Sequence, residues 1–466
     1  MRYVSTRGGA PALGFDEVLL SGLARDGGLY VPETWPKFTG AEWRDMAGRP
    51  YAEIALRILK PFVGEAIAEA DLAKMVADAY AGFGHPAVAP LKQLGANDWL
   101  LELFHGPTLA FKDYALQLVG RLFEHVLRQR RAHVTIVGAT SGDTGSAAIE
   151  ACRGRPSIDI FILHPHGRVS EVQRRQMTTV AANNVHNIAV EGTFDDCQDL
   201  LKAMFGDETF RDRVGLSAVN SINWARIAAQ IVYYAAAALA LGAPRRPVAF
   251  TVPTGNFGNV FAGYAAFRMG LPIERFVIAS NRNDILYRLL TTGTMKMAPV
   301  EPSLSPSMDI QVSSNFERLL FELAGRNGKS VHAMMRRFRK RGELTLSPAR
   351  VARLTRLFKG ARADDAETLA AIRRVYETTG ELVDPHTAVG LSAAQAERGP
   401  PHVPMVTLAT AHPAKFPDAV REATGVRPAL PARLSDLMQR PERLTVLPND
   451  RRRVQDFILE HVQVAA

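Results

Sequence analysis

A lysine within an apolar stretch is the first residue whose type and surroundings could support covalent chemistry. Lys112 lies in residues 103–113, LFHGPTLAFKD, after a Gly-Pro turn and beside apolar side chains. Burial lowers the pKa of a lysine ammonium, and the neutral amine forms a Schiff base with a carbonyl group. Lys112 is therefore a candidate nucleophile. The alternative is a surface lysine that keeps its charge in water and pairs with Asp113.

Two glycine-rich loops indicate anion sites. Residues 138–145, GATSGDTG, follow the apolar run HVTIV, and residues 253–259, PTGNFGN, follow VAFTV. A helix-forming stretch comes next in both cases, so each loop would present the unpaired N–H groups of a helix N-terminus. The first loop adds the hydroxyls of Thr140, Ser141 and Thr144. The sequence thus predicts one anion at each loop, and the alternative is a pair of ordinary strand-to-helix turns.

The first loop also differs from two familiar catalytic motifs. It lacks the Gly-Lys-Ser/Thr ending of the phosphate loop in nucleotide hydrolases. Alanine at position 139 removes the first glycine of a Gly-x-Ser-x-Gly nucleophile turn around Ser141. Neither nucleotide hydrolysis of that type nor a serine nucleophile of that type is favoured.

Two further polar segments carry candidate ligand groups. Residues 219–226, VNSINWAR, precede an alanine-rich helical stretch. Asparagine and serine at a helix entry are usually caps, but the planar guanidinium of Arg226 suits a phosphate or carboxylate. Residues 408–416, LATAHPAKF, place Thr410 at the end of a predicted strand, where open α/β sheets bind ligands. A threonine at that position is otherwise a common turn residue.

The elements that position these residues are strand-to-helix units, which indicate an α/β fold with mostly parallel sheets. Further predicted strands are residues 158–163, 187–190, 276–280 and 405–409. An amphipathic helix is expected near residues 51–63, and residues 227–244 are expected to form a buried helix. Residues 326–374 are Arg-rich and helical in pattern, with Val351, Leu354 and Phe358 at helix spacing.

Composition bounds the remaining possibilities. The 466 residues are 47% apolar and 22% charged, which excludes global disorder and suggests roughly two to four domains. The net charge of +9 admits an anionic partner, but residues 326–374 alone contain 14 Lys and Arg against 4 Asp and Glu. The excess therefore lies away from the candidate anion site. A basic protein that binds nucleic acid through this segment is the alternative from a different functional class.

Cysteine usage and the N-terminus favour a cytoplasmic protein. The two cysteines, Cys152 and Cys197, form no CxxC pair, so neither a disulfide framework nor a structural zinc site is supported. The N-terminus lacks the apolar region of a secretory signal, and no apolar run reaches the length of a membrane-spanning helix. We expect no metal site, no nucleic-acid partner and no membrane partner.

In combination, the motifs HGPTLAFKD, GATSGDTG, VNSINWAR, PTGNFGN and LATAHPAKF resemble the threonine synthase family, and YVSTRG and DGGLYVP near the N-terminus are similar to its longer fungal and enterobacterial-like branch. The resemblance implies an α/β enzyme with the tryptophan synthase β-like fold, fold type II of the pyridoxal-phosphate enzymes. It also implies conversion of O-phospho-L-homoserine and water to L-threonine and phosphate. The two predicted anions would then be the cofactor phosphate and the substrate phosphate.

The resemblance also implies roles for individual residues. Lys112 would be the catalytic residue, holding pyridoxal 5'-phosphate through a Schiff base and moving protons at the substrate's α and β carbons. Asp143 would lie beside the phenolic oxygen, where an ionised carboxylate repels a phenolate, so it is either protonated or turned away. Thr410 would face the pyridine nitrogen. The loop that would cradle the cofactor phosphate consists of Gly255, Asn256, Phe257, Gly258 and Asn259.

The substrate ligands follow from the same resemblance. Thr140 and Ser141 would bind the substrate carboxylate, and Asn256 would also reach the substrate. The residues that would hold the substrate phosphate are Thr144, Asn220, Ser221 and Arg226. The nearest alternative activity is that of a phospholyase or hydroxyamino-acid dehydratase of the same fold, which would release 2-oxobutyrate.

We expect a monomer or homodimer with four parts along the chain. The predicted parts are an N-terminal extension at 1–94, a large pyridoxal-phosphate domain at 95–114 and 226–430, a smaller mobile domain at 115–225, and a C-terminal tail at 431–466.

Overall fold

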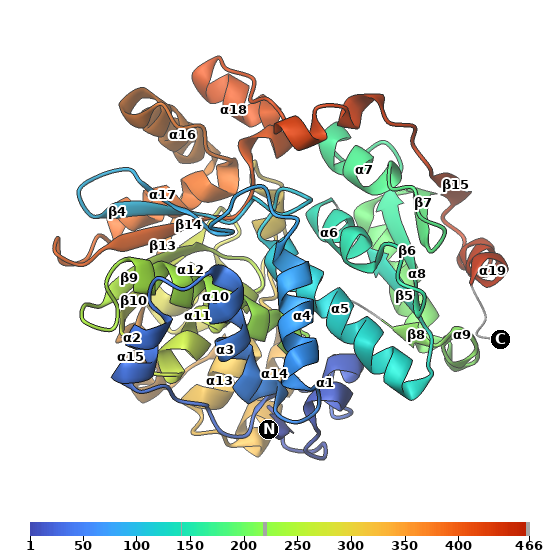
Figure 1. The fold of residues 1–466 in the computed structure, drawn as a ribbon, viewed down its shortest axis with the longest axis horizontal. Coiled ribbons are helices and arrows are strands. Elements are labelled where there is room, and N and C mark those ends of the chain that lie inside the picture. The colour runs from blue at the N-terminus through green and yellow to red at the C-terminus, as the bar shows by residue number, and fades with distance from the viewer. Residues whose placement is uncertain (141, 218–220, 463–466) are drawn as a thin grey trace. The chain divides into compact units, whose positions relative to one another are not determined.

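The computed structural model describes residues 1–140, 142–217 and 221–462, and its contacts divide the chain into two α/β units (Figure 1). The first unit comprises Met1–His105 and Ser221–Pro428, and the second comprises Gly106–Asn220 and Ala429–Ala466. Two predicted substrate ligands, Ser141 and Asn220, lie outside the described residues.

The first unit is built on a six-stranded sheet with the strand order β13-β10-β9-β14-β4-β3. All pairs are parallel except β3 with β4. Every residue of the central strands β9 and β14 is buried, as expected for parallel strands covered by helices on both faces. The sheet strands are β3 Leu91–Gln93, β4 Asp98–Glu102, β9 Val248–Pro253, β10 Ile273–Ser280, β13 Phe358–Arg362 and β14 Met405–Ala409.

The other elements of the first unit surround this sheet or form two small strand pairs. The pairs are β1 Tyr3–Ser5 with β2 Tyr30–Pro32, and β11 Thr294–Lys296 with β12 Glu343–Thr345. The helices are α1 Phe15–Ser21, α2 Gly40–Met46, α3 Tyr51–Val63, α4 Glu69–Tyr80, α10 Trp224–Ala240, α11 Gly258–Arg268, α12 Ile285–Thr292, α13 Phe316–Leu323, α14 Gly328–Arg341, α15 Pro348–Thr355, α16 Asp365–Thr379, α17 Pro385–Ala396, α18 Pro417–Thr424, and the short η1 Pro306–Met308 and η2 Pro413–Lys415.

The predicted N-terminal extension packs as part of the first unit. Tyr3 and Trp35 lie against Trp224 of α10, with ring centroids 5.9 and 6.0 Å apart. The Tyr3 hydroxyl also donates a 2.6 Å hydrogen bond to the carbonyl of Phe62 in α3. These aromatic contacts give the first 94 residues a common core with α10.

The second unit contains a parallel five-stranded sheet with the order β15-β7-β6-β5-β8. Its strands are β5 Val134–Ala139, β6 Ile158–Pro165, β7 Val185–Glu191, β8 Leu216–Ser217 and β15 Thr445–Pro448. Its helices are α5 Lys112–Arg130, α6 Asp143–Cys152, α7 Glu171–Thr178, α8 Phe194–Gly206, α9 Glu208–Val214, α19 Arg451–His461, and the short η3 Ala432–Leu434 and η4 Leu437–Gln439.

The structure draws its boundaries differently from the predicted parts at two places. Lys112 belongs to the second unit, because α5 packs closely on α6: a Cβ at Gly120 would lie 2.3 Å from the Ala151 carbonyl oxygen. The predicted C-terminal tail at 431–466 is part of the second unit. It contributes the edge strand β15 and the helix α19, whose Val454 and Ile458 are buried in the core of that unit. The mobility predicted for residues 115–225 stays a prediction.

The local predictions are confirmed for the strands at 158–163, 187–190, 276–280 and 405–409 and for the helix at 51–63. The helix predicted at 227–244 is α10, which is largely buried. None of the helices in the described part of the chain has the length and apolar character needed to cross a membrane.

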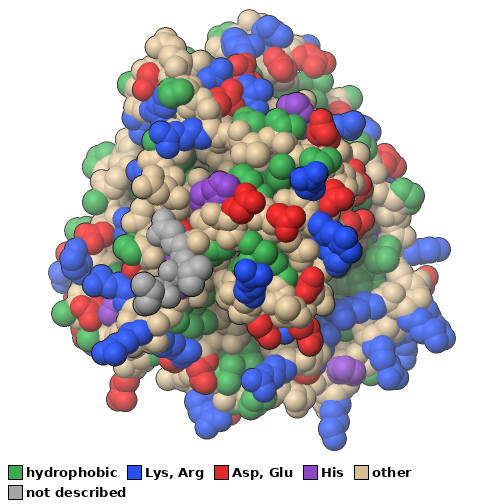
Figure 2. All heavy atoms as spheres, turned by 90° about the vertical axis from the view of Figure 1, so that its right-hand side faces the viewer, with side chains coloured by type: hydrophobic (Ala, Val, Ile, Leu, Met, Phe, Trp, Pro, Cys, Tyr) green, Lys and Arg blue, Asp and Glu red, His purple; other side chains and the backbone are tan. Residues whose placement is uncertain are grey.

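The Arg-rich segment is helical in part, with one error in the prediction. Phe358 does not continue the helix of Val351 and Leu354, because α15 ends at Thr355 and Phe358 begins the edge strand β13. On α14 only Val331 and Phe338 are buried, so most of its basic residues face solvent. On the face of the molecule that Figure 2 shows, Lys and Arg side chains are interspersed with Asp and Glu side chains.

Candidate active site

Lys112 is the first residue of α5, and its side chain is only 11% exposed. Its ammonium nitrogen lies 3.8 Å from a carboxylate oxygen of Asp143. A solvated surface lysine is therefore not what the structure shows. Asp113 is not the partner of Lys112 in these contacts. Its two carboxylate oxygens accept hydrogen bonds from the Thr108 amide at 2.8 Å and the Thr108 hydroxyl at 2.7 Å.

The loop before Lys112 is tightly built. Asp113 is fully buried, and a Cβ at Gly106 would lie 2.4 Å from the Asp113 Cβ, so only glycine fits there. Leu109 is buried with φ of +62°, a left-handed conformation that costs a branched side chain energy. Its side chain packs with Val172, Leu434 and Leu437, which compensates for that cost. The loop thereby fixes where α5 begins and where Lys112 points.

Asp143 occupies the first turn of α6 and is held from two sides. One carboxylate oxygen faces Lys112, and the other accepts a 2.8 Å hydrogen bond from the Gln173 side-chain amide on α7. Ser170 donates to the Gln173 oxygen at 2.8 Å, which sets the orientation of that amide. Asp143 is turned toward the lysine, so the carboxylate lies beside a positive charge.

The loop at 138–145 directs polar groups inward. The Thr140 hydroxyl oxygen accepts from the amides of Gly142 and Gly145, each at 3.0 Å. Gly142 has φ of +150°, and a Cβ there would meet the Gln173 side chain at 2.5 Å. Thr140 is buried and caps its own loop, while Thr144 is half-buried on α6.

In the first unit, the loop at 254–259 follows β9 and leads into α11, which begins at Gly258. The parallel neighbour β14 places Thr407 beside Thr251, so Thr410 leaves the sheet at the same edge as this loop. Thr410 is buried, while Asn256 is exposed. The N–H groups of the first turn of a helix have no acceptor within the helix, and those of α11 that follow Gly258 are suited to an anion.

The backbone of this loop is braced by a neighbouring segment. The Ser313 hydroxyl donates to the Gly255 carbonyl at 2.8 Å, and a Cβ at Gly255 would lie 2.9 Å from the Ser307 carbonyl oxygen. Phe257 adopts φ of +66° and is buried. The Asn256 side-chain oxygen accepts from the Gly258 amide at 3.0 Å. Each link restricts the path of the chain through the loop.

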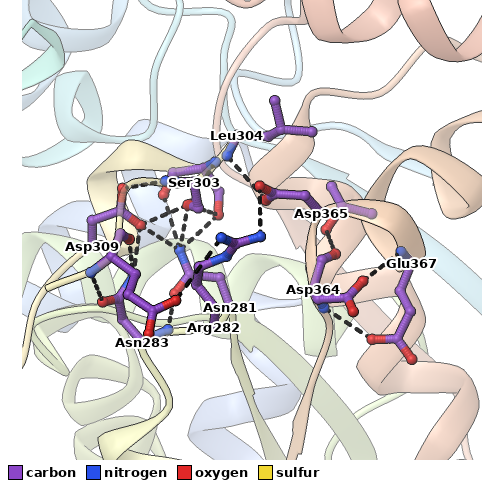
Figure 3. A network of polar contacts seen from close by, with 12 residues as sticks. Asn281, Arg282, Asn283, Ser303, Leu304, Asp309, Asp364, Asp365 and Glu367 are labelled. Atoms are coloured by element: carbon purple, nitrogen blue, oxygen red, sulfur yellow. Dashed lines mark hydrogen bonds and ion pairs between the residues drawn. The ribbon is translucent and has the colours of Figure 1, made fainter. Parts of the chain in front are cut away.

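The brace is itself held by a network of polar contacts, which Figure 3 shows. Asp309 accepts hydrogen bonds from Asn281 at 2.7 Å, Asn283 at 3.0 Å and the Ser303 hydroxyl at 2.6 Å. Arg282 pairs with Asp365 at 3.0 Å in the same view. The network fixes residues 303–309, the segment whose Ser307 lies against Gly255.

A buried histidine supports Ser307 from its other side. The Ser307 amide donates to His386 Nε2 at 3.2 Å, so that nitrogen acts as the acceptor. His386 Nδ1 then donates to Asp384 at 2.7 Å. This chain of contacts fixes the imidazole tautomer and gives Ser307 a second support.

Asn259 carries an unused polar group. Its side-chain oxygen accepts from the hydroxyls of Tyr233 at 2.6 Å and Tyr234 at 2.8 Å, so the orientation of the amide is fixed. Its buried Nδ2 has no hydrogen-bond partner among the described residues. A buried donor left unpaired is costly, which points to a ligand acceptor at this position.

Arg226 is a buried cation of the first unit with donors left unpaired among the described residues. It is 4% exposed, and its Nε and Nη1 have no hydrogen-bond partner in the described part of the chain. Burial lowers the pKa of Arg226 to about 10, so the guanidinium is still a cation at neutral pH. Asn223 caps the helix before it, accepting from the Ala225 amide at 2.9 Å. A buried cation of this kind requires an anionic ligand.

The structure therefore divides the predicted residues between the units. Lys112, Thr140, Asp143 and Thr144 belong to the second unit, while residues 255–259, Ser221, Arg226 and Thr410 belong to the first. Sequence reasoning missed Gln173, Ser307, Ser313 and His386. No motif marks them, because each acts by supporting a neighbour that folding alone brings close.

Taken unit by unit, the site residues fit pyridoxal phosphate, which carries a phosphate and a carbonyl group. Lys112 offers an amine for the carbonyl, and the start of α11 with Asn259 Nδ2 offers donors for the phosphate. Among the described residues no group of His, Cys, Asp and Glu side chains is arranged to hold a metal ion.

Comparison with known proteins agrees with this chemistry. Three sequence families match the chain: "Threonine synthase N terminus" over residues 2–80, "Pyridoxal-phosphate dependent enzyme" over residues 85–349, and "Threonine synthase, C-terminal" over residues 387–458. Threonine synthase of Pseudomonas aeruginosa is 59% identical over 462 residues, covering 99% of this chain and 98% of that protein.

Solved structures give the same result. The crystal structure of pyridoxal-phosphate-bound threonine synthase from Brucella melitensis matches with a TM-score of 0.98 and 55% identity, covering 100% of both chains. Threonine synthase from yeast matches with a TM-score of 0.95 and 39% identity over 99% of this chain and 98% of that one. The chain belongs to the threonine synthase family and is a pyridoxal-phosphate-dependent enzyme of fold type II.

Proposed function

We propose that this protein converts O-phospho-L-homoserine and water to L-threonine and phosphate, with the residues named above in defined roles. The observation that carries the proposal is the buried, unpaired guanidinium of Arg226, which matches the anionic leaving group of this reaction. Membership of the family and the buried Lys112 support it.

Pyridoxal phosphate would be held through Lys112, residues 255–259 and Thr410. Lys112 would bond to its carbonyl carbon, and residues 255–259 would hold its phosphate through backbone N–H groups and Asn259 Nδ2. Thr410 would present a neutral hydroxyl to the pyridine nitrogen. A neutral hydroxyl, unlike a carboxylate, does not require that nitrogen to be protonated. When bound, the cofactor supplies a sink for the electrons released as the substrate loses its α proton.

Lys112 would then carry protons. With the substrate bound, the amine of Lys112 would remove the α proton, give it up, and then remove a β proton. Asp143, which pairs with Lys112, would keep the lysine oriented. The same lysine would return protons to the γ carbon, which has lost the phosphate, and to the α carbon, while water supplies the hydroxyl at the β carbon.

The substrate phosphate would lie on Arg226, with Ser221, Thr144 and Asn220 as further ligands. Its negative charge grows as the bond from the γ carbon to oxygen breaks, and a buried cation stabilises that charge by about 3 kcal/mol or more. Thr140 and Ser141 would bind the substrate carboxylate, and Asn256 would reach the substrate from the cofactor loop. Retention of the phosphate on Arg226 would help to position the attacking water.

A product assay tests the proposal. Purified protein supplied with O-phospho-L-homoserine should release phosphate and L-threonine in equal amounts. Release of phosphate with 2-oxobutyrate and no threonine would instead identify a phospholyase.

We further propose a cytoplasmic monomer or homodimer that acts on small molecules, in keeping with two buried free cysteines.

A further inference from the structure

The segment that precedes and begins α13 contacts both phosphate-binding regions of the first unit. Asn315 lies just before the helix, Arg318 lies on its first turn, and both side chains are fully buried. Neither residue belongs to a motif that the sequence analysis singled out. Their contacts reach the loop at 255–259 and the segment at 221–226, as well as the N-terminal part of the chain.

Asn315 contacts both regions directly. Its backbone amide donates to the Asn256 carbonyl at 2.9 Å, and its side-chain Nδ2 donates to the Ser221 carbonyl at 3.1 Å. Phe316, the next residue, packs edge to face on Phe257 with ring centroids 5.2 Å apart. One short stretch of chain thus fixes the cofactor loop and the entry to the Arg226 segment in relation to each other.

Arg318 extends this link with three separate donors. Its Nη1 donates to the Asn315 side-chain oxygen, its Nη2 to the Ile222 carbonyl at 2.6 Å, and its Nε to the Tyr30 carbonyl at 3.0 Å. The guanidinium also lies 5.8 Å from the ring centre of Trp224. Lysine has no planar fork and cannot hold three acceptors in this geometry.

The N-terminal motifs acquire a role through the same helix. Tyr30 belongs to DGGLYVP, and Arg7 of YVSTRG forms a buried bidentate pair with Glu317 at 2.8 and 2.9 Å. Thr6 donates to the same carboxylate at 2.6 Å. The N-terminal segment therefore anchors α13, and α13 anchors the two phosphate-binding regions.

We propose that Asn315 and Arg318 are positioning residues, which hold residues 221–222 and 255–259 in one arrangement and so set the affinity for the two phosphate groups. The inference rests on the proposed roles of those two regions. Neither side chain needs to contact a ligand, because both act through backbone carbonyls.

Asn315→Asp is the sharpest variant. The aspartate keeps an oxygen for Arg318 but replaces the donor to the Ser221 carbonyl with a repelling oxygen. We expect the KM for O-phospho-L-homoserine and the inhibition constant of inorganic phosphate each to rise about tenfold, with a smaller change in kcat. Arg318→Lys should weaken both phosphate inhibition and the binding of pyridoxal phosphate to the cofactor-free protein.

Glu322→Gln is the matched control. Glu322 is equally buried on α13, pairs with Arg268 and accepts from Trp35 at 3.2 Å, without a recorded contact to either phosphate-binding region. It should lower the unfolding midpoint while leaving phosphate inhibition and cofactor affinity unchanged. Asn315→Ser, with a shorter side chain, serves if Asn315→Asp does not fold.

One set of measurements distinguishes a failure of the positioning role of Asn315 and Arg318 from a failure of the proposed phosphate role of Arg226. If Asn315→Asp and Arg318→Lys lower the unfolding midpoint but leave phosphate inhibition and cofactor affinity unchanged, the positioning role is overturned. Arg226→Gln is measured beside them. If Arg226→Gln also leaves phosphate inhibition unchanged, the proposed phosphate role of its segment is at fault. If Arg226→Gln alone weakens inhibition, only the positioning inference fails.

Discussion

The strand-to-helix loops of the two units differ in what they do with their polar groups. In the second unit, Thr140 caps its own loop, and Asp143 is shared between Lys112 and Gln173. In the first unit, Arg226 and Asn259 keep buried donors that no described residue satisfies. Among the site residues, the unpaired donors suited to anions therefore belong to the first unit, while Lys112 of the second unit lies beside a carboxylate.

This difference indicates two modes of binding. Groups that are prearranged and unpaired gain their full hydrogen bonds when a phosphate arrives, so they contribute affinity. Groups that are already paired must exchange partners, so they contribute little affinity and are suited to chemistry. We therefore expect variants of the second unit to change the rate or the covalent bond, and variants of the first to change affinity.

The largest effect is expected for Lys112→Ala in the second unit. Without the amine, the protein cannot bond to the cofactor carbonyl or move protons, so turnover should fall by about a thousandfold or more. The visible absorbance of the lysine-bound cofactor should also disappear. Spectra and product assays measure both.

Lys202→Ala is the control for this variant, because Lys202 is an exposed lysine of the same unit that pairs with Asp199. It should leave the spectrum and the rate unchanged. If Lys112→Ala retains the visible band and normal turnover, a residue other than Lys112 bonds to the cofactor.

Arg226→Met in the first unit should have a smaller effect than Lys112→Ala. We expect it to weaken substrate binding but to stabilise the ligand-free protein. Loss of the cation should raise the KM for O-phospho-L-homoserine about 100-fold. Removal of an unpaired buried charge should also raise the free energy of unfolding of the ligand-free protein by about 1 kcal/mol or more. Thermal unfolding with and without phosphate measures the second effect.

Arg336→Met is the matched change, since Arg336 is exposed on α14. We expect it to alter neither quantity. A ligand-free Arg226→Met protein that unfolds at lower temperature than the parent would show that the guanidinium is satisfied by the protein itself.

Gly255→Ala should weaken cofactor binding about tenfold. The added Cβ would lie 2.9 Å from the Ser307 carbonyl oxygen, so the loop must shift away from its brace. Titration of the cofactor-free protein with pyridoxal phosphate gives the dissociation constant. Gly82→Ala, where a Cβ meets nothing within 4 Å, should leave it unchanged. Equal cofactor affinity in the two variants would show that the contact between Gly255 and Ser307 does not set the shape of the phosphate-binding loop.

The smallest effect is expected for Asp143→Asn. The amide can still accept from Gln173 but no longer stabilises the Lys112 ammonium, so attachment of the cofactor at neutral pH should become faster by about two- to threefold. Stopped-flow absorbance measures the rate. Asp199→Asn, an exposed carboxylate, is the control. A slower attachment in Asp143→Asn would mean that the carboxylate assists the lysine.

Sequence alone predicted much of this fold, because the strands β5, β6, β9, β10 and β14 are rich in apolar residues and each has a glycine or proline within it or next to it. It failed at Phe358, whose spacing from Leu354 suits a helix although the residue begins an edge strand. It also did not predict that α19 enters the core, although Val454, Phe457 and Ile458 have the spacing of one face of an amphipathic helix.

For the site, sequence could identify side chains with reactive types but not the residues that position them. Lys112 and Arg226 carry their chemistry in the side chain, so motifs reveal them. Asn315 and Arg318 act on backbone carbonyls of Ser221, Ile222 and Tyr30, which any amino acid supplies. Such contacts leave no trace in the partner's residue type, so only the structure shows them.

The most direct test of the division of labour between the units is to find where the cofactor is attached. The purified enzyme is treated with borohydride, which reduces the Schiff base to a stable amine, and is then digested and analysed by mass spectrometry. The account predicts a pyridoxyl-phosphate group on Lys112 of the second unit. A modified lysine in the first unit, with Lys112 unmodified, would contradict it.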